Sequence, residues 1–304
     1  MVHTGQSYDY ELNKVFFENL KIRKPDYFLE VKSETLGGQI AKIIEKSEEV
    51  LKKEMPDAVL ILGDTNSALA GIIAKRMKIP IFHMEAGNRC FDENVPEEIN
   101  RKIIDHISDI NLPYSENARL YLIREGIHPG AVFVTGSPMA EIWNFYKKDV
   151  EKSQILKKLK LKKRKYFVAS IHREENVDTK ELFVKLIDAL NAVAETYNLP
   201  VIMSAHPRTE KRLNGYKLKV NKLINLHKPL GYFDYNNLQL NAFCVLSDSG
   251  TILEESSVMG FPAIQTRVSS ERPEGFDEGV LILSGLDKDI ILQAIDITTK
   301  QVAA

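Results

Sequence analysis

The chain has 304 residues, of which 44% are hydrophobic, and it carries a formal net charge of −1 at pH 7. These values suit two globular domains and exclude a general electrostatic attraction for nucleic acid. The sequence has no apolar run near the roughly 18 residues of a membrane span, no signal-peptide pattern and only two cysteines, so we expect a cytoplasmic protein without membrane contacts or a disulfide framework.

Apolar strand-like runs alternate with helical patterns through most of the chain, which is typical of an α/β fold with mostly parallel sheets. The predicted strands lie at 58–62, 79–84, 110–113, 132–135, 166–171, 200–205, 243–246 and 280–283. The predicted helices lie at 67–78, 97–108, 116–125, 180–197, 252–259 and 288–298. The pattern predicts two Rossmann-like domains that face each other across a cleft.

The segment 138–165 begins with a helical pattern and ends in a lysine-rich run, KKLKLKKRK, at 157–165. We interpret this run as a solvated helix end and linker rather than a nucleic-acid patch. We therefore place the domain boundary here, with an N-terminal domain at 1–150 and a C-terminal, nucleotide-binding domain at 151–304.

Polar residues follow the predicted strands at their carboxyl ends, where ligands bind in parallel sheets. The residues concerned are Asp64, Glu85, His172, His206 and Asp248. Each of the two histidines has an arginine within two residues, which suits an anionic substrate or a leaving phosphate. The sequence has no histidine pair at metal-ligand spacing, no Walker A loop and no GxGxxG, so we expect neither a metal nor a cofactor.

Residues 247–255, SDSGTILEE, predict a site for a nucleoside diphosphate. A strand pattern before them and helical spacing after them place Ser249, Gly250 and Thr251 at a helix N-terminus, where backbone N–H groups and the helix dipole favour an anion. Glu255 lies one turn further along, where a carboxylate suits ribose hydroxyls. The alternative is a turn that only caps the helix.

A second cluster of chemistry-bearing residues lies in the first half of the chain. Glu97 and Arg101 share one face of the predicted helix, and the alternative is an exposed ion pair of little energetic value. The helix follows the loop that carries Glu85 and Arg89, so these residues and Asp64 are expected to converge on one cleft. Carboxylates gathered in a partly dry site suit general acid and base catalysis.

The ordered motifs GDTNS, HMEAGNR, VPEEINR, TGSP, HREEN, HPRT, SDSGTILEES and ERPEG resemble those of the non-hydrolysing UDP-N-acetylglucosamine 2-epimerases. The resemblance runs from about His3 to about Ile291. It implies a GT-B fold, a homodimer, and C2 epimerisation of a UDP-linked N-acetylhexosamine, UDP-GlcNAc to UDP-ManNAc, without a cofactor. In this family UDP is eliminated to give a glycal and is then added back, and the products serve capsule and polysaccharide biosynthesis.

The resemblance also implies roles for residues of the N-terminal half and for one histidine. The family's essential carboxylates match Asp64, Glu85 and Glu97, its helix arginine matches Arg101, and its cleft histidine matches His172. Our hypothesis is that Asp64 and Glu85 form the acid/base pair and that Glu97 supports one of them. His172 and Arg101 would stabilise the departing UDP.

In the C-terminal half the resemblance implies a set of substrate-binding residues. The diphosphate-binding residues match Ser249, Gly250 and Thr251, the ribose-binding glutamate matches Glu255, the ERPE motif supplies Arg272 and Glu274, and His206 completes the set. Segment 229–235 resembles the loop that holds the uracil.

The sequence departs from the family pattern at both ends. It lacks the opening strand and the Gly-Thr-Arg-Pro-Glu loop, so we expect an N-terminal domain without its first strand. It also stops short of the family's last helix. At 6–9 it has Gln-Ser-Tyr-Asp, closer to the branch that converts UDP-2-acetamido-2,6-dideoxy-L-talose to UDP-N-acetyl-L-fucosamine. This epimerase and an inactive nucleotide-sugar-binding fragment are therefore alternatives. A GT-B glycosyltransferase and a hydrolysing epimerase are further ones.

Overall fold

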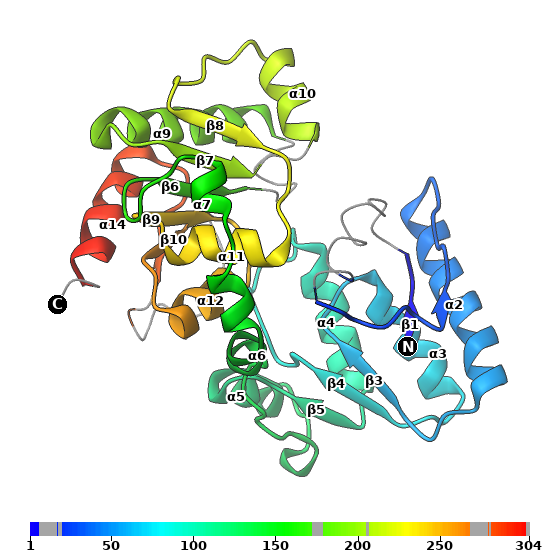
Figure 1. Cartoon of the computed structure of the whole chain (residues 1–304). Helices are drawn as coiled ribbons and strands as arrows, with labels where there is room; N and C mark the ends of the chain where they lie inside the picture. The colour runs from blue at the N-terminus through cyan, green and yellow to red at the C-terminus, as the bar shows by residue number, and fades with distance from the viewer. Residues whose placement is uncertain are drawn as a thin grey trace. The chain divides into compact units, whose positions relative to one another are not determined.

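The computed structural model describes residues 1–5, 17, 20–171, 179–204, 207–267, 279 and 281–301. The chain forms two compact units, Met1–Ser137 and Pro138–Ala304 (Figure 1). The predicted boundary after residue 150 differs from this division by one helix, α6 (Met139–Glu151), which packs on helices of the second unit. None of the helices in the described part of the chain has the length and apolarity needed to cross a membrane.

The second unit is built on a parallel sheet of six strands in the order β11-β10-β9-β6-β7-β8. The strands are β6 (Phe167–Ser170), β7 (Val201–Ser204), β8 (Ile224–His227), β9 (Cys244–Ser247), β10 (Ala263–Gln265) and β11 (Ile282–Leu283). Alternate residues of each strand enter opposite layers. Phe167 and Ala169 pack into one core with α9 (Lys180–Tyr197) and α14 (Lys288–Gln301), whereas Val168 packs into the other.

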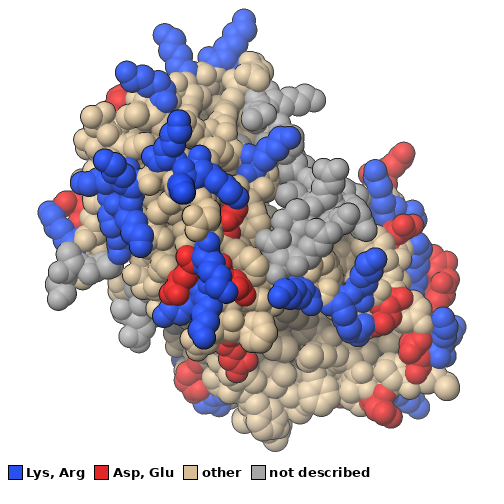
Figure 2. Space-filling view, viewed as in Figure 1, with Lys and Arg blue, Asp and Glu red and all other residues tan. Residues whose placement is uncertain are grey.

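Helices cover both faces of this sheet, which is the arrangement of a Rossmann-like unit (Figure 1). The second core joins the sheet to α6 and to the helices α11 (Tyr232–Leu240) and α12 (Ile252–Met259). The other helices in the described part of the unit are α7 (Ile155–Lys158) and α10 (Pro207–Gly215). Lysine and arginine side chains outnumber acidic ones on the face of this unit seen in Figure 2. The lysines of the predicted solvated run are exposed, as expected.

The first unit holds a parallel three-stranded sheet, β3-β4-β5, and a separate parallel pair, β1-β2. The strands are β1 (Val2–His3), β2 (Tyr27–Phe28), β3 (Val59–Leu62), β4 (Ile81–Met84) and β5 (Ile110–Leu112). Among the described residues of this unit, the helical segments are α2 (Leu36–Glu54), η1 (Asn66–Leu69), α3 (Ala70–Arg76), α4 (Pro96–Ile107), α5 (Glu116–Arg124) and η2 (Pro129–Ala131). Ile81 and Ile104 form the core between the sheet and α4.

One face of the three-stranded sheet is apolar and exposed. Leu60 and Leu62 are 64% and 65% exposed, and Leu60 pairs in register with Phe82, which is 37% exposed. The neighbouring residue Ile81 points to the other face and is fully buried. This unit therefore covers its sheet on one face only, within the described residues.

Most predicted strands and helices agree with the structure within a few residues at their ends, and the α/β class with parallel sheets is confirmed. The predicted strand at 132–135 differs: only Val132 forms a bridge, to Asn111, although Phe133 and Thr135 also donate backbone hydrogen bonds to the segment of β5. The chain turns away from β5 at Gly136, so the pairing ends after a few residues.

Candidate active site

Asp64 and Glu85 lie at the carboxyl ends of the adjacent strands β3 and β4. Glu85 has a left-handed backbone conformation, with φ of 67°, and its N–H donates to Leu112 O at 3.1 Å. Gly63 also has a positive φ, 78°, and a Cβ at this position would lie 3.4 Å from Glu85 Oε2. The carboxylate of Glu85 therefore lies beside the backbone that leads into Asp64.

Arg101 holds the carboxylate of Asp64 from helix α4. Its Nε and Nη2 atoms both lie 2.8 Å from Asp64 Oδ2. Arg101 is only 3% exposed, whereas the side chain of Asp64 is 22% exposed. Asp64 is thus oriented by a buried cation and still reachable from solvent, which suits proton transfer to a bound molecule.

Glu98 is the partner of Arg101 that the sequence analysis missed. It is fully buried, and its Oε2 accepts a hydrogen bond from Arg101 Nη1 at 3.1 Å. The same carboxylate accepts hydrogen bonds from the backbone N–H groups of Cys90 and Phe91 at 3.1 and 3.3 Å. The signal was present in the helical spacing, because Glu98 lies three residues before Arg101 and seven before the buried Asp105, on the same face of the helix.

Glu97 lies beside Glu98 in the first turn of α4 and is half-buried. The alternative of an exposed ion pair between Glu97 and Arg101 does not describe Arg101, which is buried against Asp64 and Glu98.

Arg89 was expected to converge with the carboxylates, and the structure places it elsewhere. Its guanidinium is buried and binds Asp105 at 2.7 Å and Glu125 at 2.6 and 2.8 Å. Burial alone would lower the pKa of Arg89, but the hydrogen bonds and charges of Glu125 and Asp105 outweigh it and raise the pKa. Asp105 also accepts from His83 Nδ1 at 2.8 Å, so this cluster fixes the loop that follows Glu85.

A chain of amide side chains fixes the segment that follows Asp64. Asn100 on α4 donates to Asn66 Oδ1 at 3.0 Å, and Asn66 donates to Gln39 on α2 at 3.1 Å. Amide groups bridge these three segments because each of them has both a donor and an acceptor. These residues carry no charge pattern from which their contacts could be predicted in the sequence.

In the second unit the loop between β9 and α12 is closed by its own hydroxyl groups. Ser247 Oγ accepts from Ser249 N at 3.1 Å, and Ser249 Oγ accepts from Thr251 N at 3.3 Å. The hydroxyl oxygens of Ser249 and Thr251 lie 2.9 Å apart. The two hydroxyl groups therefore lie side by side at the N-terminus of α12, with Gly250 between them in the chain.

Glu255 is tied to this loop and to the neighbouring helix α11. Its Oε1 accepts from Thr251 Oγ1 at 2.6 Å, and its Oε2 accepts from Gln239 Nε2 at 2.8 Å. A hydroxyl group of a ligand could replace the Thr251 hydroxyl as the donor to Glu255 Oε1, which is already oriented to accept a hydrogen bond.

Tyr232 and Tyr235 on α11 lie near this carboxylate. Burial raises the pKa of Tyr232 to about 12, and the charge of Glu255 adds to the shift. Burial also raises the pKa of Tyr235, again with Glu255, against a hydrogen bond to Ser170. Segment 229–235, expected as a loop, enters α11 at Tyr232. A neutral phenol next to Glu255 can donate a hydrogen bond to a bound ring or sugar.

The carboxyl edge of the large sheet presents a row of polar residues. Ser204, Ser170, Ser247 and Gln265 end their strands in register with one another. Gln265 Nε2 donates to Ser249 O at 3.0 Å, so the row continues into the loop before α12. Four predicted site residues, His172, His206, Arg272 and Glu274, lie outside the described residues.

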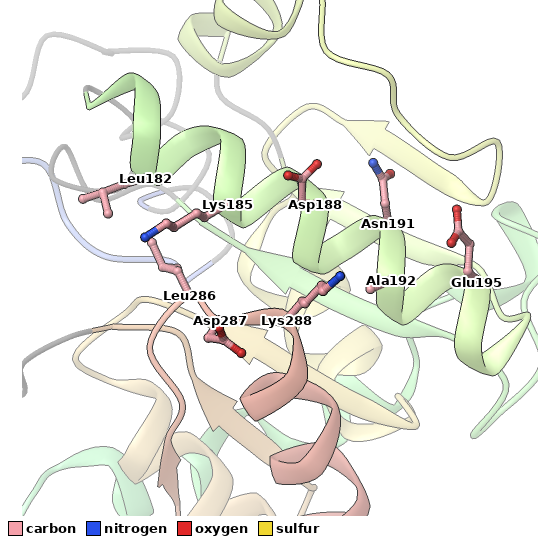
Figure 3. A pocket seen from close by; sticks show the side chains of 9 residues that line it. All are labelled: Leu182, Lys185, Asp188, Asn191, Ala192, Glu195, Leu286, Asp287 and Lys288. Atoms are coloured by element: carbon pink, nitrogen blue, oxygen red, sulfur yellow. The ribbon is translucent and has the colours of Figure 1, made fainter.

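A surface pocket of about 550 Å³ lies between α9 and the N-terminal end of α14 (Figure 3). Its lining mixes both signs of charge, with Lys288 reaching toward α9 and Asp188 and Glu195 on that helix. None of the sequence-predicted site residues that the structure describes lines it. The candidate site of this unit therefore rests on the loop before α12.

Comparison with known proteins gives a consistent result. A family model described as UDP-N-acetylglucosamine 2-epimerase matches residues 1–304. The solved UDP-N-acetylglucosamine 2-epimerase of Rickettsia bellii is 51% identical, with a TM-score of 0.90 over 98% of this chain and 80% of that one.

Two further relatives are similar over nearly the whole chain. The UDP-N-acetylglucosamine 2-epimerase of Methanocaldococcus jannaschii is 39% identical over 98% of this chain and 83% of that protein. A structure of the enzyme from that organism, in complex with UDP-GlcNAc and UDP, has a TM-score of 0.91 and covers 98% of this chain and 84% of that one. The UDP-2,3-diacetamido-2,3-dideoxy-D-glucuronate 2-epimerase of Pseudomonas aeruginosa is 33% identical over 97% and 82% of the two chains. The units described above are Rossmann-like units of a GT-B-type fold, and the chain belongs to the UDP-N-acetylglucosamine 2-epimerase family.

Proposed function

We propose that this chain is an isomerase that interconverts UDP-GlcNAc and UDP-ManNAc by inverting C2 of the sugar. The observation that carries the proposal is the pair of carboxylates at the ends of β3 and β4, with Asp64 oriented by the buried Arg101. Membership of the family and the relative bound to UDP-GlcNAc support the choice of substrate.

The C2 hydrogen is not acidified by a neighbouring carbonyl group, so we propose that C2 is inverted through elimination of UDP rather than by direct deprotonation. Two carboxylates are needed because the proton leaves one face of C2 and returns to the opposite face. In the proposed first step one carboxylate removes the C2 proton, the electron pair of that C–H bond forms the C1–C2 double bond, and the C1–O bond breaks to release UDP. In the second step UDP adds back to C1 while the other carboxylate delivers a proton to the opposite face of C2. We assign the pair to Asp64 and Glu85, with Glu97 as support, and the sum of the steps consumes no cofactor.

The loop before α12 is proposed to hold the leaving group. Ser249, Gly250 and Thr251 offer hydroxyl groups and a helix N-terminus to the diphosphate, and Glu255 offers an oriented acceptor to the ribose. Arg101, His172, His206, Arg272 and Glu274 complete the proposed set, and the last four lie outside the described residues.

Single substitutions in each unit separate chemistry from binding. Asp64→Asn and Glu85→Gln should each lower the rate of UDP-ManNAc formation by about 10²-fold or more, since each removes an acid or base group. UDP affinity measured by calorimetry should stay within about threefold in both variants, because the substituted residues lie in the other unit. Full catalytic rates in either variant would contradict the assignment.

A matched substitution in the second unit should give the opposite pattern. Thr251→Val keeps the shape of the side chain and removes the hydroxyl that contacts Ser249 and Glu255. It should weaken UDP binding by about 10- to 100-fold, the value of one hydrogen bond to a charged group. Unchanged UDP affinity would place the nucleotide away from this loop.

The choice among UDP-sugars is a finer proposal. The Pseudomonas aeruginosa relative carries the name of an epimerase for a diacetamido-glucuronate, so the family includes more than one sugar substrate. Assays of UDP-GlcNAc beside UDP-2-acetamido-2,6-dideoxy-L-talose decide between the main proposal and the branch suggested by residues 6–9. Release of free sugar instead of a UDP-sugar would identify a hydrolysing enzyme.

The cellular setting is proposed from the family resemblance alone. We infer a cytoplasmic homodimer that supplies an activated sugar for polysaccharide or capsule biosynthesis. Light scattering of the purified protein tests the dimer, and a molar mass near that of one chain would contradict it.

A further inference from the structure

We propose that Glu98, which itself need not touch substrate, is a positioning residue that sets both the orientation and the basicity of Asp64. The inference rests on the proposed function and adds a residue to it. It begins from the contacts of Arg101, whose guanidinium has a carboxylate on two of its sides: Nε and Nη2 bind Asp64 Oδ2, and Nη1 binds Glu98 Oε2.

The two carboxylates differ in accessibility, and this difference assigns their roles. Glu98 is fully buried, while the side chain of Asp64 is 22% exposed. A reacting group must reach the substrate, so Asp64 is the group that acts and Glu98 the group that holds Arg101 in place. Because a guanidinium is a planar fork, fixing one edge of it on Glu98 fixes the direction of the other edge.

Glu98 also holds the loop that begins at Glu85. Its oxygens accept the N–H groups of Cys90 and Phe91, and Phe91 has a left-handed φ of 56°. One buried side chain is therefore joined to Asp64 through Arg101 and to the Glu85 loop through the backbone. This places it where it can fix the separation of the two proposed acid/base groups.

The charge of Glu98 bears on Asp64 as well. Arg101 is shared between two carboxylates, so each of them feels less than the full stabilisation of its positive charge. Lys102 approaches Glu98 only at 3.9 Å, and the thiol of Cys90 at 3.2 Å carries no charge when protonated. Burial first, and then Glu98, raise the pKa of Cys90, which keeps this thiol neutral against a backbone hydrogen bond that opposes the shift. Removing the charge of Glu98 should leave Arg101 to stabilise the ionised form of Asp64 more strongly.

The test compares Glu98→Gln with Glu98→Asp and Glu125→Gln. Glu98→Gln removes the charge, Glu98→Asp keeps the charge on a shorter side chain, and Glu125→Gln removes another carboxylate that pairs with a buried arginine, Arg89. In Glu98→Gln we expect kcat to fall on the order of 10- to 100-fold with KM changed less than about threefold, because the reacting group is displaced while binding groups are intact. With Asp64 acting as the base, the acidic limb of the pH–rate profile should move about 0.5 to 1 unit toward lower pH, and with Asp64 acting as the acid the basic limb should move by the same amount.

The two control variants separate positioning from general damage. In Glu98→Asp, kcat should fall while both limbs of the pH–rate profile stay where they are in the wild type. Glu125→Gln should have a lower melting temperature and an unchanged pH–rate profile. A wild-type kcat in Glu98→Asp would overturn the proposal, as would a profile with both limbs unmoved in Glu98→Gln. The first of these results stays decisive even if Glu98→Gln does not fold.

A measurement without turnover separates this proposal from the proposed function. The titration midpoint of the Asp64 carboxyl carbon, followed by ¹³C NMR and assigned with Asp64→Asn, should fall in Glu98→Gln and stay unchanged in Glu125→Gln. Equal midpoints in the wild-type chain and in Glu98→Gln would overturn the inference. Absence of epimerisation by the unsubstituted chain would instead overturn the proposed function. The NMR titration would still measure the effect of Glu98 on the Asp64 carboxyl group.

Discussion

Gly63 is the residue whose local geometry most directly couples the backbone to the proposed chemistry. Its φ of 78° is a conformation that residues with a Cβ rarely adopt, and the space for a Cβ is bounded by Glu85 Oε2. Glu85 has an unfavourable backbone conformation, with φ of 67°. The hydrogen bond from its N–H to Leu112 O of the neighbouring strand stabilises this conformation. The ends of β3 and β4 are thus shaped to bring two carboxylates together.

Gly63→Ala should therefore harm both stability and activity. We expect the free energy of unfolding to fall by about 1–2 kcal/mol, the cost of a left-handed residue with a Cβ. Epimerisation should slow because relief of the strain at this positive φ shifts the backbone that leads into Asp64. Urea denaturation and a rate assay measure the two effects.

Gly37→Ala is the matched control for this prediction. A Cβ at Gly37, near the start of α2, meets nothing within 4 Å, so the change should raise the free energy of unfolding by up to about 0.5–1 kcal/mol. Equal effects of the two substitutions would show that the geometry at Gly63 is unimportant.

At the scale of single residues the sequence predicted the charged groups better than their partners. Asp64 could be proposed as a site residue because it follows a strand, Glu255 because it lies one turn after a helix start, and Arg101 because it shares a helix face with Glu97. Glu98 and the Asn100–Asn66–Gln39 chain could not, since their roles depend on contacts between segments far apart in sequence. For Arg89 the expectation was wrong, because its partners Asp105 and Glu125 lie 16 and 36 residues further along the chain.

At the scale of elements, two tyrosines contribute to the stability of helix α11: Tyr166, which is buried beneath it, and Tyr232, which is its half-buried first residue. Burial raises the pKa of Tyr166, whose hydroxyl donates to Leu238 O at 2.7 Å, and raises the pKa of Tyr232 to about 12. A group whose pKa is raised on folding contributes its stability in full below its unfolded value, about 10 for tyrosine, and loses it as pH rises toward the folded value.

The free energy of unfolding should therefore fall between about pH 10 and pH 12, with this contribution constant at lower pH. Tyr166→Phe should weaken this dependence while costing about 1 kcal/mol at neutral pH for the lost hydrogen bond. Denaturation by urea at a series of pH values, with phenolate absorbance as the reporter, measures both. Ionisation of Tyr166 and Tyr232 near pH 10 before any unfolding would contradict the prediction.

The exposed face of the β3-β4-β5 sheet gives a second prediction at this scale. Leu60→Thr should change the free energy of unfolding by less than about 0.5 kcal/mol, because this leucine is 64% exposed. Ile81→Ala, on the buried face of the adjacent strand, should cost about 2–4 kcal/mol. A large loss in Leu60→Thr would mean that another segment or another chain covers this face.

Element type was predictable where apolar residues repeat with a clear period. Helices α9 and α12 were placed at their observed bounds, because their buried residues repeat at helical spacing. Helix α11 was not predicted, since it buries Asn236, Asn237 and Gln239 and so lacks an apolar stripe. Strand β10 is only three residues long and its pattern is too short to separate from a loop.

At the scale of the whole molecule, the two units differ in how much core they bury. The second unit has two large apolar cores on the two faces of a six-stranded sheet, whereas the first unit has smaller clusters around its three-stranded sheet. Since burial of apolar surface is the main favourable term in folding, the first unit should be the less stable of the two.

Two spectroscopic signals can separate the units during unfolding. Trp143, the single tryptophan of the chain, lies on α6 in the second unit and is 7% exposed, so its fluorescence reports that unit. Circular dichroism reports helices of both units. In a urea titration the circular dichroism signal should begin to change before the fluorescence of Trp143 does, and coincident curves would contradict two units of unequal stability.

The central claim, inversion at C2 through removal and return of the C2 proton, is tested most directly in heavy water. UDP-GlcNAc incubated there with the chain should give UDP-ManNAc, with one solvent deuterium at C2 of the product and, as the reaction reverses, at C2 of the recovered substrate. Asp64→Asn should abolish this exchange while UDP still binds. Binding of UDP without deuterium at C2 in the unsubstituted chain would contradict the claim.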